Sequence, residues 1–221
     1  SQFCAAEEST IKDSQGMTCH VYTPKIDQNQ TYWLVVGVHG YRGNGKGAGG
    51  MASWINKHPN CIVIGPSFKD GYQMGDGNHA KKLIKLQKEL GKKYKLHKKM
   101  FLYGFSGGAQ FAHRFAMKNA RLVCGVSAHS AGSWATQGYG RISSSAKNIP
   151  FAISCGENDT AKSVASSPLN RIDWFKDFSK TLEKRKFNVV SKTWPGTGHS
   201  KNPGVDKMTE DCFKLATAAK R

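Results

Sequence analysis

A serine flanked by glycines lies at the end of a short apolar segment. Gly104-Phe105-Ser106-Gly107-Gly108 follows the run KMFLY at residues 99–103 and precedes a helix-compatible run at 109–116. A G-x-S-x-G sequence between a strand and a helix is typical of a sharp turn that raises the serine hydroxyl above a sheet and directs the helix N-terminus at it. The pattern therefore predicts Ser106 as the nucleophile of an acyl-transfer reaction.

A second serine, Ser130, lies in the similar sequence AHSAG, which also follows an apolar segment. The residues after it, 133–140, are rich in glycine and lack the periodicity of an amphipathic helix. The interval from Ser130 to Asp159 is also too short for a full strand–helix–strand unit. Ser106 is thus the favoured nucleophile, and Ser130 is expected in a loop near it.

A serine nucleophile needs a general base, and an acid that orients the base. His199 follows the apolar segment 188–194, late in the chain. Asp159 comes just after the segment 150–155, with Glu157 as the alternative acid. The order serine, acid, histidine differs from that of chymotrypsin-like and subtilisin-like enzymes.

The loop after the apolar run 33–38 begins with His39-Gly40-Tyr41. Acyl transfer creates an oxyanion, which two backbone N–H groups must already face. We expect these donors to be the amides of Gly107 and Tyr41, since His39-Gly40 lets the backbone turn close to a substrate.

Neither a metal site nor a cofactor site is expected. Gly40, Gly45 and Lys46 mimic a phosphate-binding loop, but Gly47 occupies the position at which serine or threonine would bind magnesium. The glycines of this loop also mimic a dinucleotide fingerprint, but the next strand lacks the acid that binds ribose. The six cysteines form no C-x-x-C pair, so a structural zinc site is not indicated.

The elements that must position these residues alternate along the chain. Short apolar segments predict strands at 19–23, 33–38, 61–65, 100–104, 122–128, 150–155 and 188–194. Apolar stripes with helical spacing comprise Ala80, Leu83, Ile84 and Leu90; Ile172, Phe175, Phe178 and Leu182; and Met208, Cys212, Leu215 and Ala219. Strands that alternate with helices predict a three-layer α/β/α sandwich with a mostly parallel sheet. We expect one catalytic domain at 19–221, preceded by an N-terminal segment at 1–18.

Composition restricts the class of protein and its surroundings. The 221 residues are 38% hydrophobic, without an apolar run long enough to span a membrane. A net charge of +18 favours adsorption to anionic surfaces, but the lysines at 81–99 lack interleaved aromatic residues, so specific nucleic-acid binding is not expected. The even cysteine count suits a secreted or periplasmic protein, and Cys4 with Cys19 is the disulfide that would best restrain the N-terminal segment. We expect a monomer.

From about residue 19 to its end, the chain resembles the α/β-hydrolase superfamily. The motifs that carry the resemblance are the elbow at Ser106, the His39-Gly40-Tyr41 loop, and the later Asp159 and His199. The compact length resembles secreted carboxylesterases without a cap domain, such as polyhydroxybutyrate depolymerases, feruloyl esterases and cutinase-like polyester hydrolases.

The resemblance implies a serine carboxylic ester hydrolase that acts through an acyl-enzyme on bulky or polymeric esters in an open cleft. It implies that Tyr41, Trp134 and His39 contact the substrate, and that the loop Asp70-Gly71-Tyr72 borders the same cleft. A small-ester carboxylesterase, a thioesterase or a peptidase on the same scaffold remains the alternative. A basic binding protein without catalysis is a further one.

Overall fold

The computed structural model describes residues 6–13, 16–69 and 71–218. The strands in these residues form one eight-stranded sheet. The strand order across the sheet is β1-β2-β4-β3-β5-β6-β7-β8. The strands are β1 (Glu7–Lys12), β2 (Thr18–Thr23), β3 (Tyr32–Val38), β4 (Cys61–Pro66), β5 (Leu96–Phe105), β6 (Val123–His129), β7 (Phe151–Gly156) and β8 (Val189–Trp194). Across the sheet, the strands β4-β3-β5-β6-β7-β8 are all parallel to their neighbours. The strand β2 pairs antiparallel with both β1 and β4. The predicted, mostly parallel sheet is confirmed.

The α-helices of the described residues are α1 (Gly77–Lys93), α2 (Gly107–Lys118), α3 (Arg171–Lys184) and α4 (Gly204–Ala218). Of these four α-helices, three connect strands of the sheet and the last, α4, follows β8. Short 3-10 helices are η1 (Lys46–Gly50), η2 (Ala52–Asn56), η3 (Tyr72–Met74), η4 (Ala120–Leu122) and η5 (Ser144–Ala146). Within the described part of the chain, no helix combines the length and the apolar character that crossing a membrane requires.

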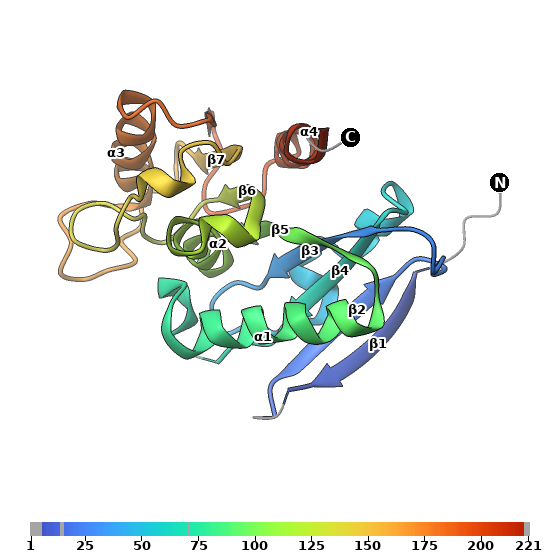
Figure 1. The fold of residues 1–221 in the computed structure, drawn as a ribbon. Helices are drawn as coiled ribbons and strands as arrows, with labels where there is room; N and C mark the ends of the chain where they lie inside the picture. The colour runs from blue at the N-terminus through green and yellow to red at the C-terminus, as the bar shows by residue number, and fades with distance from the viewer. Residues whose placement is uncertain (1–5, 14–15, 70, 219–221) are drawn as a thin grey trace.

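The sheet is covered on both faces, as predicted, because alternate residues of its central strands point to opposite sides. Leu34 and Val36 of β3 belong to an apolar cluster with α1, α2 and α3. Trp33 and Val35 belong to a second cluster with η2 and α4. Figure 1 shows α1 and α4 on opposite sides of the sheet. Every residue of β3 is buried, which explains its continuous apolar sequence.

The sequence did not predict β1, which extends the sheet within the N-terminal segment 1–18. Its sequence, EESTIK, is mostly exposed and lacks apolar alternation, so no pattern in the sequence marks it. The expected Cys4–Cys19 disulfide is not borne out, because Cys19 is a free, buried thiol and Cys4 lies outside the described residues. Cys61, Cys155 and Cys212 are also free, buried thiols, and Cys124 is buried. The argument for an oxidising compartment from cysteine number loses its support.

The buried face of α4 differs from the predicted stripe. Leu215 is 52% exposed, and Ala219 lies outside the described residues. The residues that α4 buries are Val205, Thr209, Cys212, Phe213 and Ala216. The stripe was misplaced because Leu215 and Ala216 are both apolar, so the sequence does not distinguish the two faces.

Trp134, predicted to contact substrate, lies in the core. Its ring is 0% exposed, stacks on Phe178 at 5.0 Å between centroids and lies 4.9 Å from the ring of His113. The buried Arg114 guanidinium donates to the carbonyl of Trp134 at 3.2 Å and to that of Tyr139 at 2.9 Å, which fixes the surrounding loop. The substrate-binding role of Trp134 is therefore corrected to a packing role.

Replacing this indole by a methyl group leaves a cavity in the core. We expect Trp134→Ala to lower the free energy of unfolding by about 3–5 kcal/mol. Leu215→Ala on the exposed face of α4 is the control, with an expected change within about 0.5 kcal/mol. Urea denaturation of both variants measures the difference, and equal losses would contradict the core placement of Trp134.

Candidate active site

The turn between β5 and α2 places Ser106 in a strained backbone conformation. Its φ is 56° and its ψ is −119°, a region that costs roughly 1–3 kcal/mol for a residue with a side chain. The Ser106 amide donates to the carbonyl of His129 at 2.9 Å, which ties the turn to β6. A Cβ on Gly108 would lie 2.1 Å from the carbonyl oxygen of Val38, and one on Gly104 would lie 2.2 Å from the Gly108 carbonyl carbon. Glycine at both positions permits this close approach.

Ser106, His199 and Asp159 form a continuous hydrogen-bonded chain. His199 Nε2 lies 3.0 Å from Ser106 Oγ, and His199 Nδ1 lies 2.7 Å from Asp159 Oδ2. With the proton on Nδ1, the imidazole donates to the carboxylate and accepts from the serine hydroxyl. The loops that follow β5, β7 and β8 bring the three predicted residues together, because parallel strands end at the same edge of the sheet.

The Asp159 carboxylate is 1% exposed and is held from more than one side. Its Oδ1 accepts from Arg171 Nη1 at 3.1 Å, and the Cys155 thiol lies 3.8 Å from Oδ2. Burial, and then the charge of Asp159, raise the pKa of Cys155 to about 12, so this thiol stays neutral. The alternative acid, Glu157, instead accepts from the Thr193 hydroxyl at 2.9 Å.

The loop after β3 lies against the first residue of α2. The Tyr41 amide nitrogen is 2.9 Å from the position that a Cβ on Gly107 would occupy. Gly107 begins α2, and the leading amides of a helix have no acceptor within the helix. The two amides expected to bind an oxyanion are thus adjacent. The Tyr72 hydroxyl reaches the same place: it donates to the His39 carbonyl at 2.8 Å and lies 2.7 Å from that Cβ position.

The side chains of this loop differ in exposure. His39 is 4% exposed and its Nδ1 donates to the Gly40 carbonyl at 2.7 Å, so its ring shapes the turn and presents no surface to a substrate. This corrects its predicted substrate contact. Tyr41 is 57% exposed, with the Arg42 guanidinium 5.2 Å from its ring centroid. Of the predicted border loop, Asp70 lies outside the described residues and Tyr72 is buried.

His129, the last residue of β6, and Ser130, which follows it, support the site. Ser130 is 2% exposed, and its amide donates to the Ser154 carbonyl at 2.8 Å. The buried His129 ring lies 2.7 Å from the hydroxyls of both Ser127 and Ser154. Burial, reinforced by the charge of Lys201, lowers the pKa of His129 to about 3, so the ring is neutral. These two hydrogen bonds fix the end of β6, where the His129 carbonyl accepts from the Ser106 amide.

Arg171 had no sequence signal at all, and the sequence placed Tyr72 only in a loop expected to border the cleft. Arg171 contacts Asp159 across a loop whose course local pattern does not reveal. The buried hydroxyl of Tyr72 lies beside Gly107 although η3 is separated from it by the whole of α1 and β5. Among the described residues, no group of three or more histidine, cysteine, aspartate or glutamate side chains is arranged to bind a metal ion.

No protein-family model matches the sequence, and no curated protein matches it. The structure is similar to that of a thermostable esterase, with 17% identity and a TM-score of 0.72 over 98% of this chain. The chain spans only 63% of that esterase.

Two further solved structures match over most of both chains. A ferulic acid esterase from Anaeromyces mucronatus has 20% identity and a TM-score of 0.72, over 96% of this chain and 90% of its own. A poly(3-hydroxybutyrate) depolymerase from Bordetella parapertussis has 18% identity and a TM-score of 0.69, over 97% and 90%. At these identities the likeness establishes architecture. Together with the strand order and the three-layer packing, it shows that the chain has the α/β-hydrolase fold.

Proposed function

We propose that the protein is a serine carboxylic ester hydrolase that acts through an acyl-enzyme. The observation that carries the proposal is the unbroken chain from Ser106 Oγ through the His199 imidazole to the buried Asp159 carboxylate. Hydrolases with this fold hold the same three residue types at the same strand ends, in the same chain order. The strained turn at Ser106 supports the same assignment, because such strain is concentrated at functional sites.

The proposed mechanism follows from the geometry. His199 Nε2 takes the proton of Ser106 as the serine oxygen attacks the ester carbonyl. Asp159 holds the imidazole in the required tautomer and stabilises its cation, while the amides of Gly107 and Tyr41 bind the oxyanion. His199 then protonates the departing alcohol, and a water molecule repeats the sequence on the acyl-enzyme to release the acid.

Bulky esters, including polymeric ones, are the substrate class we propose. The His199 side chain is 31% exposed and Tyr41 is 57% exposed, so the site opens towards solvent. Residues 130–150, all of which the structure describes, contain only the short helix η5 between β6 and β7, which leaves no cap at this position. The likeness to a ferulic acid esterase and to a poly(3-hydroxybutyrate) depolymerase agrees with this class. With Trp134 and His39 buried, Tyr41 is the remaining aromatic candidate for substrate contact.

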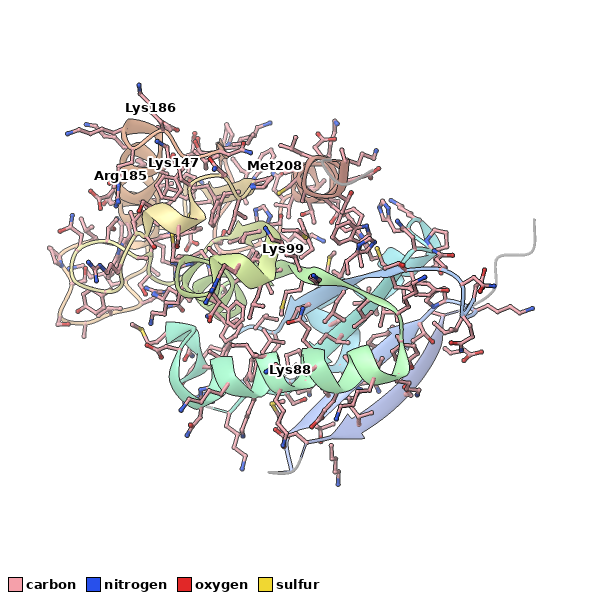
Figure 2. All side chains as sticks on the ribbon, in the orientation of Figure 1. Lys88, Lys99, Lys147, Arg185, Lys186 and Met208 are labelled. Carbon is pink, nitrogen blue, oxygen red and sulfur yellow. The ribbon has the colours of Figure 1, made fainter. Side chains whose placement is uncertain are left out.

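The positive charge is spread over the molecule. Figure 2 labels basic side chains on separate elements: Lys88 on α1, Lys99 on β5, Lys147 after η5, and Arg185 and Lys186 after α3. The excess of 33 basic over 15 acidic residues gives a general attraction to anionic surfaces. We propose that this charge promotes adsorption to anionic insoluble substrates.

Removing the nucleophile should abolish turnover. We expect Ser106→Ala to lower kcat by about 10⁴–10⁶-fold and to prevent labelling by a fluorophosphonate probe, with an unchanged circular dichroism spectrum. Ser130→Ala is the matched control, because the Ser130 side chain hydrogen-bonds with Cys155, and this variant should keep most activity and its labelling. The reverse result would overturn the nucleophile assignment.

The pH profile should identify the base and its acid. We expect kcat/KM to rise with pH and then reach a plateau, since only the neutral imidazole of His199 accepts a proton. His129, with its pKa near 3, and Cys155, with its pKa near 12, do not titrate between about pH 5 and 9, so neither produces this limb. Asp159→Asn should cost about 10²–10⁴-fold in kcat, and the control Glu157→Gln less than about threefold. Equal losses would contradict Asp159 as the acid.

An open site and a cationic surface predict distinct responses to salt. Hydrolysis of soluble p-nitrophenyl acetate and of a bulky feruloyl ester should vary little between about 10 mM and 300 mM salt. Adsorption to an anionic polyester film should weaken as the Debye length shrinks below about 10 Å. Release of soluble product from the film and depletion of protein from solution measure both effects. If the film is not attacked, the polymeric class is excluded, and a feruloyl ester that is also resistant would leave a small-ester carboxylesterase.

A further inference from the structure

The buried acid of the site has a partner that its proposed chemistry does not require. Asp159 Oδ2 receives the imidazole, and Arg171 Nη1 donates to the other oxygen, Oδ1, at 3.1 Å. We propose that Arg171 is a positioning residue that fixes the Asp159 carboxylate, and that its positive charge opposes part of the attraction between Asp159 and a protonated His199. This inference rests on the proposed function, because it concerns the same three side chains.

The two oxygens of the carboxylate have separate tasks. A carboxylate held only through Oδ2 can rotate about its Cβ–Cγ bond, which would turn the acceptor away from His199. The hydrogen bond from Arg171 to Oδ1 opposes that rotation. Asp159 is 1% exposed and the Arg171 side chain 19%, so the ion pair is largely shielded from solvent and from salt. A charge-assisted bond in such a place is stronger than one on the surface.

The place of Arg171 in α3 disfavours a purely local role. Arg171 is the first residue of the helix, where the macrodipole is unfavourable to a cation. The start of the helix is capped without the guanidinium: the Asn170 side chain accepts from the Asp173 amide at 2.9 Å, and the Asp159 carbonyl accepts from the Ile172 amide at 3.1 Å. Neutral replacement of Arg171 should therefore leave the helix and the loop folded.

A second contact aims the guanidinium. Arg171 Nε donates to Ser163 Oγ at 2.6 Å, from the loop between β7 and α3. Ser163 in turn packs against the loop after β6, since its Oγ lies 3.0 Å from the position of a Cβ on Gly132. This arrangement fixes the direction in which Nη1 points. Ser163→Ala should produce a weaker form of any defect caused by loss of Arg171.

The charges that face the imidazole determine the sign of the effect. Asp159 stabilises the imidazolium, and the positive charge of Arg171 offsets part of that stabilisation. The neutral Cys155 thiol of β7 adds no charge beside Asp159, and the Phe105 ring of β5, whose centroid is 5.3 Å from that of His199, adds none either. Lys201, two residues beyond His199, is paired with Asp206. Removal of Arg171 should therefore favour protonated His199.

The test compares Arg171→Met, Arg171→Lys, Ser163→Ala and the control Arg185→Met, an arginine just beyond the other end of α3. We expect Arg171→Met to lower kcat about 10–100-fold, with KM changed less than about twofold, because the acid is misplaced and substrate contacts remain. The acid limb of kcat/KM should move towards alkaline pH, because the imidazolium loses a neighbouring positive charge. Arg171→Lys, which keeps the charge, should return the limb towards its wild-type position. Arg185→Met should leave both the limb and kcat unchanged.

A measurement that needs no turnover separates this inference from the proposed function. In Ser106→Ala protein, NMR follows the His199 ring signals with pH, and adding Arg171→Met should move their midpoint to higher pH. An unchanged midpoint together with an unchanged limb would overturn the role of Arg171, even if the protein is an esterase. A further outcome is a shifted midpoint although the wild-type protein, which retains Ser106, neither hydrolyses esters nor reacts with a fluorophosphonate. That result would support the role of Arg171 and refute the proposed function.

Discussion

The backbone of α2 approaches β3 and β5 so closely at its first turn that no side chain fits between them. Cβ atoms at Gly104 and Gly108 would overlap backbone atoms, so this contact exists only with glycine at both positions. The approach drives the chain through the unfavourable φ of Ser106, and the bond from its amide to β6 holds it there. The same approach brings Gly107 against the Tyr41 amide. A single steric constraint thus places both the proposed nucleophile and the predicted oxyanion donors.

Asp159 imposes the second constraint, because a carboxylate removed from water requires compensating partners. Its partners come from three elements: the loop after β8 supplies His199, α3 supplies Arg171 and β7 supplies the Cys155 thiol. Each contact joins the loop of Asp159 to another element. The buried carboxylate therefore fixes the position of that loop relative to β7, α3 and the loop after β8. Glu157, only two residues away, points to Thr193 and lacks such surroundings.

The parts of the site that sequence predicts are those defined by the end of a strand. Ser106, Asp159 and His199 each follow an apolar segment, and parallel strands place their carboxyl ends at one edge. The strands themselves are visible because a sheet covered on both faces needs continuous apolar residues. β1 is the exception: it is a mostly exposed, polar edge strand, and its pairing with β2 leaves no apolar pattern in its sequence.

Burial of loop residues follows from tertiary packing, which local pattern does not encode. Trp134 and His39 both lie in loops that follow strands, near the proposed nucleophile, so their sequence positions suited a cleft wall equally well. Trp134 is covered by Phe178 of α3, and His39 lies 4.9 Å from the ring of Tyr72, which belongs to η3. Arg171 is the opposite case: it begins a helix, where sequence alone suggests a solvated cation, yet it reaches the buried acid. In each case a partner distant in sequence decides whether the side chain packs in the core or contacts the charged groups of the site.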